Sequence, residues 1–76
     1  MALSRKEWAR IKVFGANVRR ERVRLGWTQD ELAENAHIAT RNLQKLEGGQ
    51  INLLLTTAFR IQLALDCPWK RLAPAE

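Results

Sequence analysis

The chain has 76 residues, which suffices for one domain at most, and its apolar content of 46% argues against a disordered polyelectrolyte. A single cysteine and a single histidine exclude an internal disulfide and a four-ligand zinc site. The formal net charge of +5 gives a basic surface, which attracts polyanions such as nucleic acid or an acidic membrane.

No segment of the sequence is apolar for long enough to act as a signal peptide or as a membrane span. Because a lone cysteine suits a reducing compartment, we expect a cytoplasmic protein. The sequence contains no nucleophile beside a base, no paired carboxylates and no glycine-rich phosphate loop. We therefore predict no enzymatic activity, no cofactor and no metal site.

The first predicted helix begins after Ser4, because Ser4 and Glu7 have the spacing of a capping box. Apolar residues then recur at near-helical intervals, and Gly26 is a suitable C-terminal stop. Gly15 interrupts this pattern, so the sequence also allows a break between residues 13 and 15.

The second predicted helix covers roughly residues 29–35 and has the strongest start signal in the chain. Thr28 and Glu31 form a second capping box. Trp27 and Leu32 have the spacing of a hydrophobic staple, which fixes the direction in which the chain enters a helix.

The rest of the chain predicts three further helices separated by short connections. These elements are a turn at residues 36–38, a third helix from Thr40 to about Leu46 that ends at Gly48-Gly49, a fourth helix near residues 53–65, and a short fifth helix between Pro68 and Pro74. The expected fold is therefore an all-α, compact five-helix bundle. It forms a single domain over residues 1–76, with its core at 14–72 and an N-terminal helical extension at 4–13.

The segment from residue 29 to residue 48 combines two short helices that must cross over a tight turn. Ala33 supplies the small residue needed where such helices approach closely. The apolar residues that can face the core are Leu32, Ala36, Ile38, Leu43 and Leu46. The outward face of the third helix carries Thr40, Arg41, Gln44 and Lys45, with Asn42 at its side. Side chains of these types read base edges in the major groove of B-form DNA, which admits a helix.

This arrangement resembles the lambda-repressor-like helix-turn-helix family, also called the Cro/phage-repressor or XRE type, over residues 14–72. The matching motifs are Phe14-Gly15-Ala16-Asn17-Val18-Arg19, Arg22, Gly26-Trp27-Thr28-Gln29-Asp30-Glu31-Leu32-Ala33, Leu43-Gln44-Lys45-Leu46-Glu47-Gly48-Gly49 and Ile61-Gln62-Leu63-Ala64-Leu65. The resemblance implies a lambda-repressor-like bundle and a sequence-specific transcriptional regulator. Such a protein binds double-stranded DNA as a homodimer, with its third helix in the major groove.

The resemblance also implies roles for individual residues. The base-contacting residues are Thr40, Arg41, Gln44 and Lys45. The phosphate-contacting residues are Gln29, Asn42, Gln50, Asn52 and Arg19. Arg22 and Glu47 match a pair that forms an internal salt bridge. The alternatives left open are an exposed helix former for Gln29, helix caps for Thr40 and Asn52, and solvated charges for Arg41, Lys45 and the Arg22–Glu47 pair. For Lys45 a phosphate contact is a further alternative.

Four departures from the family pattern affect these expectations. His37 stands at a turn position that is usually glycine, and histidine is among the residues that tolerate a positive φ there. Ala39 replaces the usual Ser or Thr cap of the third helix, at a cost of ~1 kcal/mol. Glu21 replaces an apolar residue, which predicts a shift of that face of the first helix. The loop that begins at Gly48-Gly49 lacks the basic residue often found there.

Within the family, the short length and the stretch Gly-Gln-Ile-Asn-Leu resemble controller proteins of restriction–modification systems, while phage-type and chromosomal regulators stay open. A protein-interaction module of the same fold, such as an antitoxin or a coactivator, is the alternative function. The fourth and fifth helices are the candidate dimer interface, because the run Leu53-Leu54-Leu55 cannot all face one core. Trp69 and Leu72 either lie across that interface or cover the core of one protomer. We expect no membrane partner and no small-molecule domain.

Overall fold

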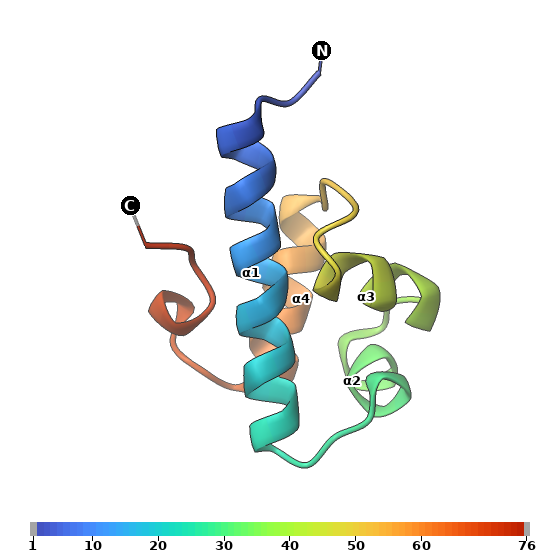
Figure 1. Cartoon of the computed structure of the whole chain (residues 1–76). Coiled ribbons are helices and arrows are strands. Elements are labelled where there is room, and N and C mark those ends of the chain that lie inside the picture. Colours follow the sequence, from blue (N-terminus) through green and yellow to red (C-terminus); the bar gives the residue numbers. More distant parts are fainter. Residues whose placement is uncertain (1, 76) are drawn as a thin grey trace.

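The computed structural model describes residues 2–75, which form four α-helices and one 3-10 turn, without a β-strand. These elements are α1 (Arg5–Arg24), α2 (Gln29–Ala36), α3 (Thr40–Glu47), α4 (Leu55–Leu65) and the 3-10 turn η1 (Trp69–Arg71). The all-α fold predicted from the sequence is confirmed. The long α1 runs through the middle of the molecule, with α2 and α3 on one side of it and η1 on the other (Figure 1).

The prediction of a fifth helix holds only in part, because the chain forms a single 3-10 turn, η1, between Pro68 and Pro74. Pro68 precedes this turn as its N-cap, and Pro74 follows shortly after it. A proline fixes its own φ and pushes the residue before it out of the α-helical region. The few residues between the two prolines therefore close one turn and cannot extend it.

The α1 helix is continuous through Gly15, so the break that the sequence allowed at residues 13–15 does not occur. Gly15 is buried where α1 crosses the end of α3. A Cβ atom at this position would overlap the carbonyl oxygen of Leu46. Gly15 thus allows two helices to approach closely, as its lack of a side chain permits.

The two predicted capping boxes are present at the starts of α1 and α2. The Ser4 hydroxyl accepts from the Glu7 N–H (3.1 Å), and the Glu7 carboxylate accepts from the Ser4 N–H (2.8 Å). Thr28 and Glu31 make the same two contacts at 3.1 and 2.8 Å. By contrast, α3 and α4 begin without a side-chain cap. The start of α4 lies two residues after the position predicted for it.

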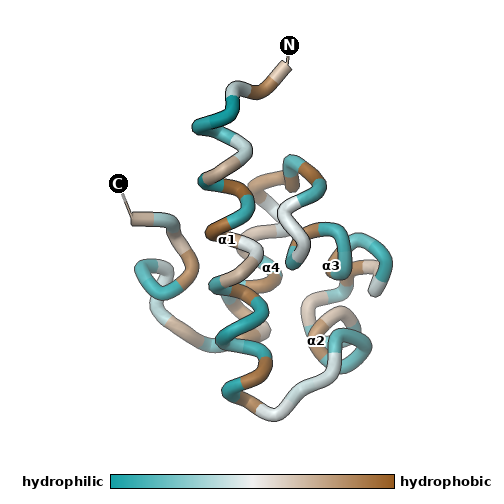
Figure 2. Tube along the Cα trace, viewed as in Figure 1, coloured by the Kyte–Doolittle hydropathy of each residue, from teal (hydrophilic) through white to brown (hydrophobic). Residues whose placement is uncertain are grey.

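The core draws on all four helices and on the segment that follows α4. Its buried apolar residues are Phe14, Val18, Leu32, Ala33, Ala36, Leu43, Leu46, Ala58, Ile61, Leu65, Cys67 and Leu72. Hydrophobic residues recur between hydrophilic ones along α1, as expected for a helix that turns one face to a core (Figure 2). Burial raises the pKa of the Cys67 thiol, and the nearby Glu21 carboxylate raises it further.

The C-terminal segment is anchored to α1 and completes the protomer core. Leu72 is fully buried, so of its two possible positions it takes the one inside the protomer. The Asn17 side-chain amide donates to the Leu72 carbonyl (3.0 Å), and the Arg20 guanidinium donates to the Arg71 carbonyl (2.7 Å). Trp69 keeps 40% of its surface exposed.

Glu21 occupies a buried position on α1 where the family pattern has an apolar residue. Only 7% of its side chain is exposed, and its carboxylate is paired with three arginines. Arg20 and Arg24 lie 3.2 and 3.4 Å away on the same helix, and Arg71 reaches it from η1 at 3.5 Å. A buried carboxylate is tolerated when it is paired in this way.

Candidate nucleic-acid interface

The α3 helix has one apolar face and one long polar face, separated by helical spacing. Leu43 and Leu46 are buried in the core. On the other side Arg41, Gln44 and Lys45 are exposed, and none of their side chains makes a hydrogen bond or an ion pair with residues 2–75. The outward face is therefore a set of donors without intramolecular partners.

Thr40 and Asn42 lie on the two sides of this face. Thr40 is the first residue of α3 and is half-buried, and Asn42 is exposed. The N-cap of α3 is Ala39, so Thr40 does not act as the cap. Thr40, Arg41, Gln44 and Lys45, the four residues predicted to contact bases, all belong to this one helix, and it carries no acid in its first turn.

The turn between α2 and α3 is closed by His37, which adopts the left-handed conformation with φ 58° and ψ 44°. The Ile38 N–H donates to the Ala33 carbonyl (3.0 Å) across this turn. The His37 N–H donates to the Glu34 carbonyl (3.2 Å), so two carbonyls in the last turn of α2 find donors, as in a Schellman motif. Ala33 is buried, and its small side chain lets α3 cross close to α2.

A buried charge network joins α1, the start of α2 and the end of α3. The Arg22 guanidinium donates to the two carboxylate oxygens of Glu47 at 2.7 and 3.0 Å, so the predicted ion pair is present. Only 11% of the Arg22 side chain and 3% of the Glu47 side chain are exposed. Arg22 also donates to the Trp27 carbonyl (2.8 Å). This network holds the ends of α2 and α3 in a fixed relation.

Gln29 belongs to the same network, which the sequence alone did not indicate. Its side-chain amide donates to Glu47 Oε1 (3.0 Å), so the residue is more than an exposed helix former. The amide retains a second N–H and a carbonyl oxygen for another partner. Gln29, Arg19 and Gln44 line one polar cleft of about 550 Å³ between α1, α2 and α3. The structure therefore brings together two of the five predicted phosphate-contacting residues.

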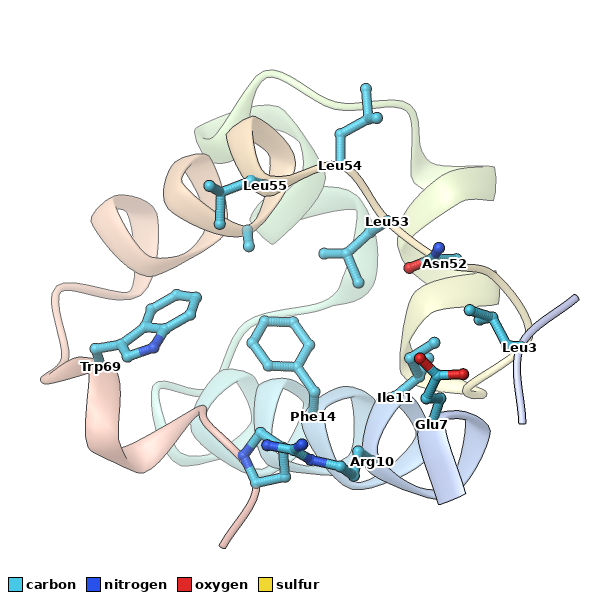
Figure 3. A pocket seen from close by; sticks show the side chains of 12 residues that line it. Leu3, Glu7, Arg10, Ile11, Phe14, Asn52, Leu53, Leu54, Leu55 and Trp69 are labelled. Atoms are coloured by element: carbon cyan, nitrogen blue, oxygen red, sulfur yellow. The ribbon is translucent and has the colours of Figure 1, made fainter. Parts of the chain in front are cut away.

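The two other such residues outside α3 lie apart from this cleft, on the connection between α3 and α4. Gln50 and Asn52 are both exposed. Asn52 does not cap α4, whose N-cap is Leu54. It lines an open, mostly apolar pocket beside Leu3 and Glu7 of the N-terminal end, with Trp69 at the far end of the pocket (Figure 3).

A row of exposed apolar side chains on α4 has no counterpart among the predicted site residues. Leu55, Phe59 and Leu63 follow one another at intervals of four, and 63%, 49% and 73% of their surfaces are exposed. The Trp69 ring lies 6.0 Å from that of Phe59 and extends this row. The spacing of four residues is visible in the sequence, but apolar core residues between these positions, such as Ala58 and Ile61, obscure it.

The described residues give no sign of a metal centre or a membrane span. Within residues 2–75, no group of His, Cys, Asp and Glu side chains is arranged to hold a metal ion. In the same part of the chain, no helix has both the length and the apolar character needed to cross a bilayer.

Comparison with known proteins gives a matching family model and several similar solved structures. The helix-turn-helix family model of the XRE/lambda-repressor type matches residues 18–72. The restriction-modification controller protein C.AhdI from Aeromonas hydrophila is 28% identical, with a TM-score of 0.80 over 84% of this chain and 97% of its own. The hypothetical transcription factor NHTF from Neisseria is 27% identical, with a TM-score of 0.80 over 97% of this chain and 86% of its own. No curated protein matches the sequence significantly.

Proposed function

Because the chain belongs to the lambda-repressor-like (XRE-type) helix-turn-helix family of DNA-binding transcription regulators, we propose that it binds a specific duplex site as a homodimer, with α3 in the major groove. The observation that carries this proposal is the outward face of α3. The side chains of Arg41, Gln44 and Lys45 are exposed there and have no partner within residues 2–75. The major groove of B-DNA is wide enough for a helix, and it presents acceptors that such side chains recognise.

The remaining polar residues fit the phosphates on either side of the groove. Gln29 and Arg19 share a cleft at the start of α2, where backbone N–H groups and the helix dipole favour an anion. Asn42, Gln50 and Asn52 are exposed along α3 and the connection that follows it. Arg22 and Glu47 take no part in binding in this proposal. They orient α3 relative to α2.

The homodimer is supported by the exposed apolar row Leu55, Phe59 and Leu63 on α4. Such a row is costly in water, and a second copy of the same row covers it across a two-fold axis. Helix-turn-helix dimers read two half-sites about one helical turn apart. The symmetry of the protein and that of the site then match.

A role as controller of a restriction–modification system is the finer candidate within this function. It is supported by the similarity to C.AhdI, a controller protein almost all of whose length is matched by this chain. The protein-interaction alternative has less support, because the outward face of α3 is polar and carries no acid in its first turn.

Selection of bound sites from random duplexes tests the function directly. We expect a palindromic pair of half-sites, and binding that weakens steeply with salt. About eight phosphate contacts per dimer give a log–log slope near −7. Failure to enrich any sequence, together with a flat salt response, would rule out this function.

The variant Arg41→Ala tests the base-reading role of α3. We expect a loss of about 1–3 kcal/mol at one base position and relaxed specificity there. Lys70→Ala is the matched control, since it removes an exposed positive charge from η1, away from α3. If Arg41→Ala weakens binding to every sequence equally, Arg41 contacts a phosphate and not a base.

A further inference from the structure

Three exposed cations lie along one side of α1. Arg5, Lys12 and Arg19 are seven residues apart, which is close to two helical turns, so their side chains leave the helix in similar directions. From Arg5 to Arg19 the row is ~21 Å long. None of their three side chains makes a hydrogen bond or an ion pair with residues 2–75. We call Arg5, Lys12 and Arg19 the basic strip.

One end of the basic strip adjoins the candidate interface. Arg19 lines the cleft that also contains Gln29 and Gln44. Lys12 lies against the connection after α3, where a Cβ on Gly49 would come within 2.7 Å of the Lys12 Cα. Gly49, with a φ of 68°, packs closely on the Lys12 backbone, and Lys12 is still exposed.

The other end of the basic strip extends beyond the helix-turn-helix unit. The first turns of α1 project past the other helices toward the N-terminus (Figure 1). Arg5 and Lys12 precede residues 18–72, which the family model matches. Two of the three strip residues therefore lie outside the segment that the family model matches, and Arg19 lies inside it.

The other cations of α1 differ from the strip in their partners or their direction. Arg20 and Arg24 are paired with the buried Glu21 carboxylate. Lys6 is exposed, but its side chain leaves the helix ~100° away from that of its neighbour Arg5.

We propose that the basic strip follows the sugar-phosphate backbone outside the bases read by α3, so that α1 binds the DNA flanking the site. This inference rests on the proposed DNA-binding function. Measured along the duplex axis, the length of the row corresponds to about six base steps, since B-DNA rises ~3.4 Å per phosphate of one strand. The connection between α3 and α4, residues 48–54, carries no basic residue, and the strip supplies phosphate contacts that this connection lacks.

Two double variants with the same loss of charge test the proposal on the full chain. Arg5→Gln/Lys12→Gln removes two cations of the strip, and Lys6→Gln/Lys70→Gln removes two exposed cations elsewhere. Gln keeps the helix propensity close to that of Arg and Lys, so both proteins are expected to fold, and circular dichroism verifies this. The measurement is the affinity for the selected duplex, with long and with short flanks, as a function of salt concentration.

We expect the strip variant to reduce the salt slope by about 2 per protomer and to weaken binding to the long duplex at least ~10-fold. The control variant should stay close to the parent protein. Shortening the flanks should weaken the parent protein but not the strip variant. If both variants weaken binding equally, or the flanks have no effect, the strip proposal is wrong while the DNA-binding function stands. If the parent protein binds no duplex, the proposed function itself fails.

Discussion

The Arg22–Glu47 pair shows how a few buried atoms set the geometry of the candidate interface. The two side chains come from α1 and the end of α3, and Gln29 from α2 joins the same carboxylate. A buried ion pair often contributes little net stability, because both charges lose their hydration. Its effect is to make one relative orientation of α2 and α3 much more favourable than the others.

Breaking this pair on one side should therefore cost far more than replacing it. Glu47→Leu leaves the buried Arg22 charge without its carboxylate counter-ion, and we expect a loss of about 3–5 kcal/mol in the free energy of unfolding. The double variant Arg22→Met/Glu47→Leu should recover most of this loss. Urea unfolding of the parent, the single variants and the double variant measures the coupling. If the loss in the double variant equals the sum of the losses in the two single variants, the two side chains are not coupled and the prediction is wrong.

The conformations and contacts of residues near this pair could be predicted from the sequence only where a local motif or a family motif specifies them. The left-handed turn at His37 and the Arg22–Glu47 contact follow from motif positions in the sequence. The contacts of Gln29 with Glu47 and of Glu21 with Arg71 do not, because their partners are 18 and 50 residues away in the chain. Only the packing of α2 against α3, and of η1 against α1, brings these atoms together.

At the scale of elements, helix starts were predictable where a side chain makes the cap. Ser4 and Thr28 define the starts of α1 and α2 because the capping box uses residues within one turn. The start of α4 follows Leu54, which makes no side-chain cap, so no local signal marks it. Gly15 has a poor helix propensity, yet the close approach of Leu46 explains its presence in an unbroken helix.

The uncapped start of α3 leads to a prediction about stability. Ala39 has an extended backbone suited to an N-cap, but no side-chain oxygen to accept from the first turn of the helix. Ala39→Ser should therefore stabilise the protein by about 0.5–1 kcal/mol, and Thr28→Ala should destabilise it by ~1 kcal/mol. Thermal unfolding of both variants tests these two expectations. An unchanged midpoint for Ala39→Ser would show that the free N–H groups of α3 are already satisfied.

For DNA binding, the same substitution separates two models of α3. If its first turn orders fully only on DNA, Ala39→Ser should also tighten binding, since less ordering remains to be done in the complex. Slower amide exchange of the first turn in the bound parent protein than in the free one would agree with this. Equally slow exchange in both states would show that the turn is already ordered.

At the scale of the whole molecule, the surface is divided into faces of different chemistry. The outward face of α3 and the basic strip are polar or cationic, and the row on α4 is apolar. The sequence predicted that Leu53-Leu54-Leu55 could not all be buried, and Leu54 and Leu55 are indeed 72% and 63% exposed. It could not decide which apolar residues of α4 face the core, since two apolar stripes share that helix.

The α4 row should hold two copies of the chain together, and its removal should separate dimerisation from folding. Leu55→Gln/Leu63→Gln changes two side chains that are 63% and 73% exposed, so the protomer core is left intact. Val13→Gln/Val23→Gln is the matched control, because both valines are exposed on α1. Sedimentation equilibrium should give a monomer for the first variant and a dimer for the control and the parent protein.

The monomeric variant should also lose the preference for two half-sites over one, because the second half-site adds affinity only when the two protomers are joined. If the variant remains dimeric, the interface lies elsewhere on the protein. If the parent protein is monomeric both free and on DNA, there is no dimer.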